Sequence, residues 1–129
     1  MRRFFLGFAG LAGAAAVIAG ASADHALAGH PHRAQLARIG AEYGLIHAAA
    51  LLAVIAVIAV AACGWPQTVA RVAAWCFVVA EVFFCGGLYT AAAGSHALLP
   101  LVPVGGTLFI IGWLALFASA FGRGTAGAA

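Results

Sequence analysis

Residues 44–62 read GLIHAAALLAVIAVIAVAA, and this run decides the fold. His47 is the only side chain in it that is neither apolar nor glycine. A helix needs about 20 mostly apolar residues to cross the hydrocarbon core of a membrane. Three further stretches have similar length and character, so the sequence predicts a membrane protein with four spans, at residues 4–23, 44–62, 72–93 and 104–121.

The composition of the whole chain agrees with this prediction, since 66% of the 129 residues are hydrophobic and 7% are charged. The connections between spans are too short to bury a core of their own, which predicts one transmembrane domain over residues 1–129. A net charge of +3 from scattered arginines excludes a nucleic-acid-binding face. The expected fold class is all-α, a four-helix bundle whose first partner is the lipid bilayer.

The connection between the first two spans has a pattern of its own. Over residues 31–42, Arg33, Arg38 and Glu42 alternate with apolar side chains. This pattern predicts a short helix that lies in the membrane interface before Gly40 turns the chain inward.

The arginines also predict an orientation. Four spans place Arg33 and Arg38 on one side and the larger group on the other, namely Arg2, Arg3, Arg71 and Arg123. The positive-inside rule then puts both termini in the cytoplasm. Residues 2–24 also resemble a secretory signal with an Ala21-Ser22-Ala23 cleavage site, but the length of this stretch and its small residues at every fourth position favour retention of the first span.

Glu81 is the outlier among the ionisable residues, because it falls near the middle of the third span. A carboxyl group at that depth is expected to face the bundle interior, to be protonated, or to have a partner. Helical spacing puts Cys85 and Leu88 on its face. The functional interpretation is a proton, ion or ligand site, and the structural one is a neutral side chain hydrogen-bonded to a neighbouring helix.

His47 and Tyr43 lie one turn apart on the second span and are the candidate partners of Glu81. Together they can hold a headgroup, a quinone oxygen or a metal. The alternative is a histidine that bonds a backbone carbonyl beside an interfacial tyrosine. A haem between His25 and His47 is a further alternative, although no cofactor is expected.

The first connection also offers a weak alternative as a metal site, for zinc or copper. Its spacing matches no standard motif, and a solvated loop explains the same residues. The four candidate ligands are Asp24, His25, His30 and His32.

Several short motifs together resemble the DUF423 family of small inner-membrane proteins, which is similar to the transmembrane protein 256 group. The resemblance covers residues 20–116 and implies a four-span bacterial inner-membrane protein that retains its first span, but it implies no activity. The chain departs from the family pattern at Asp24 and Glu81, so a mechanism built on Glu81 is expected to be particular to this protein. The motifs are Asp24-His25-Ala26-Leu27, Tyr43 with His47-Ala48-Ala49-Ala50-Leu51-Leu52, Gly86-Gly87-Leu88-Tyr89, Pro103-Val104-Gly105-Gly106 and Gly112-Trp113-Leu114.

Glycines in these motifs are predicted to let helices approach closely. They are Gly86, Gly87, Gly105, Gly106 and Gly112.

Two functions remain open at this point. The first is a non-enzymatic accessory or structural subunit that packs in a larger membrane complex or a homo-oligomer. The second is a protein that binds or moves a proton, an ion or a small ligand through Glu81, His47 and Tyr43. Because the sequence contains no G-x-S-x-G motif, no phosphate loop and no paired carboxylates, an enzyme is not expected.

Overall fold

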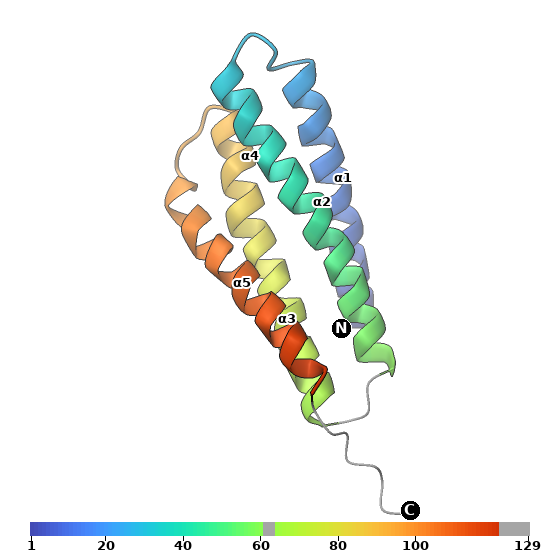
Figure 1. Ribbon diagram of the computed structural model, residues 1–129. Coiled ribbons are helices and arrows are strands. Elements are labelled where there is room, and N and C mark those ends of the chain that lie inside the picture. The colour runs from blue at the N-terminus through green and yellow to red at the C-terminus, as the bar shows by residue number, and fades with distance from the viewer. Residues whose placement is uncertain (61–63, 122–129) are drawn as a thin grey trace, which may run out of the picture.

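The computed structural model of the protein describes residues 1–60 and 64–121, and no strand occurs within these two ranges. Four of its helical segments are long and apolar enough to cross a membrane, which confirms the all-α membrane fold. A π-helical turn, η1, joins α3 and α4 into one rod, and a 3₁₀ turn, η2, precedes α5 (Figure 1). The elements are α1 (Arg2–Asp24), α2 (Pro31–Val60), α3 (Trp65–Ala80), η1 (Glu81–Cys85), α4 (Gly86–Ala92), η2 (Leu99–Leu101) and α5 (Val102–Ser119).

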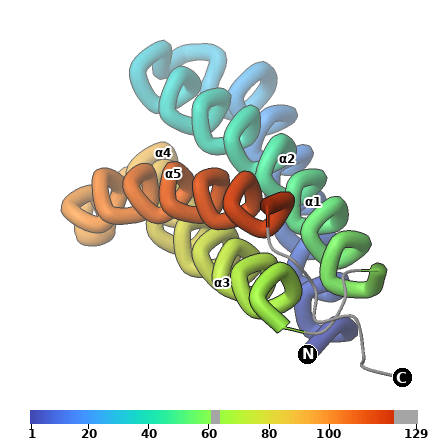
Figure 2. The backbone as a smooth tube through the Cα atoms, turned by 60° about the horizontal axis from the view of Figure 1, so that its bottom comes forward, coloured from blue at the N-terminus to red at the C-terminus, as the bar shows by residue number. Residues whose placement is uncertain are grey.

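The helices pack chiefly as two pairs. α1 lies along α2, and α5 lies along α3 and η1, while α2 also contacts the α3–α4 rod (Figures 1 and 2). The α1–α2 and α4–α5 connections lie at one end of the molecule, and the start of α1 and the start of α3 lie at the other end. This alternation is what four successive crossings produce.

The predicted interfacial helix is not found as a separate element. Residues 31–42 form the first turns of α2, which continues without a break through Gly40 to Val60. The physical reason is that a single glycine weakens a helix without ending it. In the structure Gly40 instead makes room for the ring of Tyr89, since an added Cβ would lie 2.6 Å from Tyr89 Cε1. The last predicted residues of the second span, 61 and 62, fall outside the described ranges.

Glycine and proline mark the ends of the α3–α4 rod. Gly64, with φ 118°, precedes α3, and Pro66 occupies the first turn, where its missing N–H costs nothing. Gly94, with φ 102°, lies just after α4. Both glycines have a backbone conformation that other residues rarely adopt, so the sequence fixes where the rod begins and ends.

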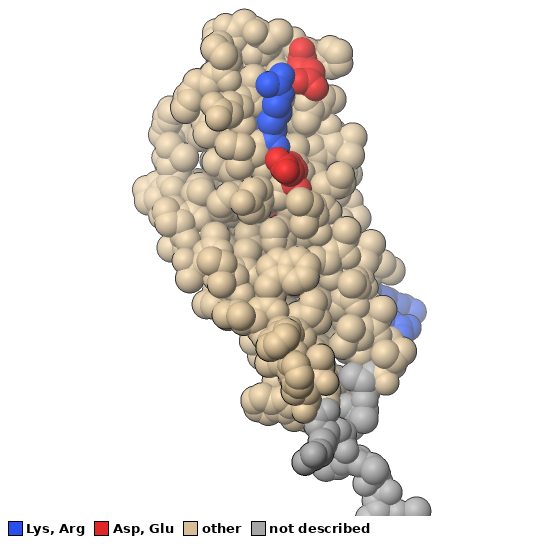
Figure 3. Space-filling view, viewed as in Figure 1, with Lys and Arg blue, Asp and Glu red and all other residues tan. Residues whose placement is uncertain are grey.

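The core runs along the centre of the bundle and includes Phe5, Leu51 and Phe77, each nearly inaccessible. Large apolar side chains such as Leu114 and Phe117 point outward, as expected for surfaces in contact with lipid. On the face shown in Figure 3, charged side chains gather near the α1–α2 connection and near the N-terminal end, and a broad uncharged band separates them.

Candidate functional site

His47 is buried in an aromatic cluster and both of its ring nitrogens have partners. Trp113 Nε1 lies 3.1 Å from His47 Nε2, and His47 Nδ1 lies 2.8 Å from the Tyr43 carbonyl oxygen. Because indole N–H can only donate, Nε2 accepts, and Nδ1 must carry the proton that is donated to the carbonyl. The ring also stacks on Phe109 with centroids 3.5 Å apart. The hydrogen bonds therefore define a neutral histidine with one tautomer.

This arrangement leaves His47 no free lone pair for a metal or a haem iron. Tyr43 is 43% exposed, and its ring packs against Phe84 with centroids 4.8 Å apart. His25, the other proposed haem ligand, is exposed in the α1–α2 connection. Within the described ranges no hydrogen bond joins Glu81 to His47 or to Tyr43, so the three predicted site residues do not form one hydrogen-bonded group.

Glu81 has a different set of neighbours. Its side chain is 7% exposed, and its Oε2 atom is buried without a hydrogen-bond partner. A Cβ added at Gly44 would lie 3.2 Å from Glu81 Oε1 and 2.8 Å from the Tyr89 hydroxyl oxygen, so both groups converge on that glycine. The Tyr89 hydroxyl donates to the Gly40 carbonyl oxygen at 2.8 Å. Its hydrogen is therefore committed to α2 and leaves the carboxyl group without a donor from this side.

The π-helical turn explains why Tyr89, rather than Leu88, accompanies Glu81. Regular helical spacing predicts Leu88 on the face of Glu81, but a π turn inserts one extra residue and moves the next turns round by one position. The same turn is in close contact with α5. A Cβ on Gly105 would lie 2.5 Å from the Phe84 backbone nitrogen. The turn thus places Glu81 and its neighbours and also receives α5.

Glu81 lines a groove between α1 and the rod formed by η1 and α4. Two adjoining hollows, of about 320 and 410 Å³, share Ala15 and Tyr89, and we call them together the lateral groove. Their walls are almost entirely apolar. The smaller hollow contains Glu81, Cys85 and Thr90 from the rod and faces a wall from α1 made of Phe8, Leu11, Ala12 and Ala15.

The second hollow of the lateral groove leads toward the α1–α2 connection. Ile18, Ala19 and Ser22 of α1 line it. Arg33 lies at its wall and donates from Nε to the Ala92 carbonyl oxygen at 2.6 Å. The groove therefore carries an arginine in one hollow and a carboxyl group in the other.

The four candidate metal ligands do not converge. Asp24 forms an ion pair with Arg38, whose Nη2 lies 2.7 Å from Asp24 Oδ1. His25, His30 and His32 are exposed. Nowhere in residues 1–60 and 64–121 do three histidine, cysteine, aspartate or glutamate side chains meet in a geometry that could hold a metal ion. The structure thus places these residues apart, with Asp24 already paired.

The five predicted packing glycines divide into two groups. An added Cβ would lie 2.5 Å from Phe84 N at Gly105 and 2.6 Å from a side-chain atom at both Gly87 and Gly112. At Gly106 the nearest atom is 3.7 Å away, and at Gly86 nothing lies within 4 Å. Close approach is therefore found at one member of each glycine pair, together with Gly112.

The fold and the site together define a small multi-pass helical membrane protein with a groove between its helices. Comparison with known proteins agrees. The model of the protein of unknown function family DUF423 matches residues 19–106, and the chain belongs to this family.

Two relatives are bacterial proteins of the same description. A UPF0382 membrane protein of Haemophilus influenzae is 33% identical over 94% of this chain and 96% of its own length. A UPF0382 membrane protein of Staphylococcus haemolyticus is 44% identical over 38% of this chain and 41% of its own length. No solved structure matches the chain.

Sequence reasoning missed Tyr89 and Gly44 as neighbours of Glu81, and Gly40 as a neighbour of Tyr89. One signal was present: Gly40 and Gly44 are four residues apart, so they form a narrow strip on one face of α2. The position of Tyr89 depended on the π turn, which no residue pattern in residues 81–85 announces.

Proposed function

We propose that this protein is a non-enzymatic membrane protein that binds an amphiphilic small molecule from the bilayer in its lateral groove. The apolar chain of the ligand lies along α1, and a hydroxyl, amine or carbonyl group of its head bonds Glu81. The observation that carries the proposal is the unpartnered, buried Oε2 atom of Glu81 beside an apolar hollow.

The free energy of an unsatisfied polar atom supports a bound partner. A buried group without a hydrogen bond costs about 1–3 kcal/mol, so native proteins rarely leave one unless it serves a purpose. Glu81 lies 11 positions before the end of α4, roughly 17 Å along the rod, where no bulk water is expected to solvate it. A polar head that enters the groove supplies the missing hydrogen bond.

The shape of the groove supports a ligand with a long apolar part. On the α1 side, small side chains such as Ala12, Ala15 and Ala19 leave the space open. α1 packs mainly against α2 and makes few contacts with the rod, so the groove borders the surface that lipid covers. A molecule dissolved in the membrane can therefore reach Glu81 sideways.

The second candidate is the accessory-subunit role predicted from the sequence. Exposed apolar side chains such as Ile110 and Leu114 on α5 suit a neighbouring protein and lipid equally well. Packing in a larger complex or a homo-oligomer therefore stays a prediction, which co-purification in a mild detergent tests.

Filling the groove tests the proposed ligand site. Ala15 lines both hollows, so Ala15→Phe should block them, whereas its neighbour Ala14 is exposed and lines neither. We expect native mass spectrometry of the protein incubated with a bacterial lipid extract to show a bound amphiphile on the wild type and on Ala14→Phe, and none on Ala15→Phe.

Helical content and elution volume of the two variants must match the wild type for this comparison to hold. An equal amount of amphiphile on Ala15→Phe, or none on the wild type, would exclude the groove as the binding site.

A further inference from the structure

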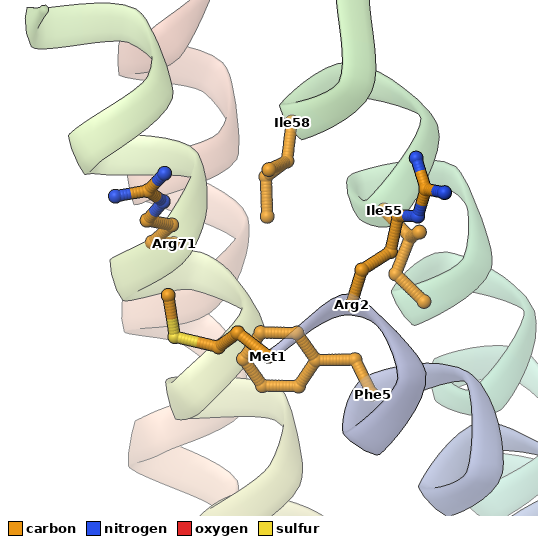
Figure 4. A pocket seen from close by; sticks show the side chains of 6 residues that line it. All are labelled: Met1, Arg2, Phe5, Ile55, Ile58 and Arg71. Atoms are coloured by element: carbon orange, nitrogen blue, oxygen red, sulfur yellow. The ribbon is translucent and has the colours of Figure 1, made fainter.

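A separate cavity lies at the opposite end of the molecule from the α1–α2 connection. It has a volume of about 140 Å³ and is lined by Met1, Arg2, Phe5, Ile55, Ile58 and Arg71. Figure 4 shows Arg71 on α3 at one side of the cavity, and Arg2 and Ile55 at the other, with Phe5 and Met1 along the edge between them. The cavity shares no residue with the lateral groove.

The two arginines have no acidic partner there. Arg71 donates from Nη2 to Gln67 Oε1 at 3.0 Å, but its Nε atom is buried without a partner. The one ion pair in residues 1–60 and 64–121 is that of Asp24 and Arg38, at the other end. The chain has three acidic side chains in all, and none lines this cavity. Keeping a partly buried guanidinium group without a counter-ion is unfavourable in free energy, so an anion bound between the arginines would stabilise the site.

The size and walls of the cavity indicate which anion. Its volume is several times the ~30 Å³ that a water molecule occupies in the liquid, which is enough for a phosphate group. Guanidinium groups match phosphate oxygens with paired hydrogen bonds. The remaining walls, from Phe5, Ile55 and Ile58, are apolar and suit the carbon chains next to a lipid phosphate.

We propose that this cavity binds the phosphate of an anionic phospholipid between Arg2 and Arg71. The Arg71 Nε–H and the Arg2 guanidinium donate to the phosphate oxygens, and the apolar walls contact the glycerol and the first acyl carbons. Basic pockets between helix ends bind anionic headgroups in this way. The site goes beyond the groove proposed above, because it recognises a negative charge at the membrane surface.

The test is native mass spectrometry of the full-length protein titrated with phosphatidylglycerol. Loss of one charge-assisted hydrogen bond should weaken binding about tenfold or more in Arg71→Gln and in Arg2→Gln. The matched control is Arg3→Gln, which removes the same charge at the next, exposed position outside the cavity and should bind like the wild type. Arg71→Lys keeps the charge but lacks the Nε–H donor, so it should bind several-fold more weakly.

Further arms identify the source of the phosphate. Phosphatidylcholine, which is zwitterionic, should bind more weakly than phosphatidylglycerol, and inorganic phosphate at millimolar concentration should not displace the lipid. Equal binding of the two lipids, an equal loss in Arg3→Gln, or wild-type binding by Arg71→Lys would overturn the proposal. Binding of inorganic phosphate without binding of phosphatidylglycerol would overturn the lipid as its source.

Discussion

Within the described ranges, His47 and Glu81 are the buried side chains of basic or acidic residues, and their surroundings differ. His47 has a partner on each ring nitrogen, from Trp113 and from the Tyr43 backbone. Glu81 keeps one oxygen without a partner beside an open groove. Both ring nitrogens of His47 thus have hydrogen-bond partners, whereas Glu81 has a buried oxygen without one, and this is why the proposed ligand site is placed at Glu81.

Replacing Trp113 tests the structural role of His47. Trp113→Phe keeps an aromatic ring but leaves His47 Nε2 without a donor, so it should lower the free energy of unfolding by about 0.6–1.7 kcal/mol. Unfolding in mixed detergent micelles, followed by circular dichroism, measures the change. Trp65→Phe, at a position 62% exposed, is the control and should be near neutral. Equal stability of the two variants would contradict the proposed role of the Trp113–His47 hydrogen bond.

The substitution Glu81→Leu distinguishes a ligand-binding role of Glu81 from a structural role in which its carboxyl group bonds a neighbouring helix. Removing an unpartnered buried polar atom should leave the free energy of unfolding unchanged or raise it by about 1 kcal/mol. If Glu81 instead bonds a neighbouring helix, the same substitution should destabilise the bundle. Unfolding in mixed detergent micelles distinguishes the two roles, because only the structural role predicts that Glu81→Leu lowers the free energy of unfolding.

The residue patterns could predict Glu81 as the outlier, since an acidic residue inside an apolar run stands out in any sequence. They could not predict its neighbours. Tyr89 takes the place expected of Leu88 because of a backbone irregularity, the π turn of residues 81–85, which lies against Gly105 of α5. The grouping of Glu81 with His47 and Tyr43 relied on their depth in the membrane, which does not determine which faces of two helices meet.

At the scale of helices, the α3–α4 rod and α5 contact each other at two glycine pairs, 86–87 and 105–106. Only one member of each pair, Gly87 or Gly105, is tightly packed. A Cβ added at Gly105 would lie 2.5 Å from Phe84 N in η1 and 3.0 Å from Ala80 O in α3, whereas one added at Gly106 would have its nearest neighbour at 3.7 Å. These neighbouring backbone atoms cannot move away from an added methyl group by a change of side-chain rotamer. Of the helix contacts made at the predicted packing glycines, the one between η1 and α5 at Gly105 is therefore the least able to adjust to an added side chain.

Alanine substitutions at this pair should have opposite effects. Gly105→Ala should destabilise the bundle by about 1–3 kcal/mol through overpacking. Gly106→Ala should be neutral, or stabilising by up to about 1 kcal/mol, because alanine favours the helix. Thermal unfolding of the two purified variants in one detergent compares them directly, and a Gly105→Ala variant as stable as Gly106→Ala would contradict the observed contact.

Helix existence was predictable because apolar runs of membrane-spanning length have few alternatives. The boundaries of the helices were harder to predict than their existence. The polar side chains of residues 31–42 indicated a separate interfacial helix, but the structure continues α2 through them, since nothing between Pro31 and Tyr43 breaks a helix. The third span was predicted from residue 72, but α3 begins at Trp65, directly after Gly64 and with Pro66 in its first turn.

At the scale of the whole molecule, the distribution of arginines predicts that the α4–α5 connection faces away from the cytoplasm and the start of α3 faces toward it. Single cysteines introduced as Ser95→Cys and Thr68→Cys, both at exposed positions, test this in a variant without native cysteines. A membrane-impermeant maleimide added to intact cells should label residue 95 and spare residue 68. The reverse pattern would show the opposite orientation.

The whole molecule combines a tightly packed side, between α3 and α5, with a looser side where α1 leaves space beside the rod. The difference arises from side-chain size. Phe77, Phe84 and Phe109 fill the space between the rod and α5, whereas α1 contributes the small side chains of Ala12, Ala15 and Ala19 to the groove wall. The proposed ligand site lies on the looser side and includes no residue of α5.

The most direct test of the lateral groove as a binding site is to quantify the small molecules that co-purify with the protein. Wild type and Glu81→Leu are purified side by side from their membrane in mild detergent, and bound small molecules are quantified by mass spectrometry. We expect an amphiphile with a polar head on the wild type, near one per chain, and at least about tenfold less on Glu81→Leu. Equal amounts on both proteins, or no bound amphiphile on the wild type, would contradict a site anchored by Glu81.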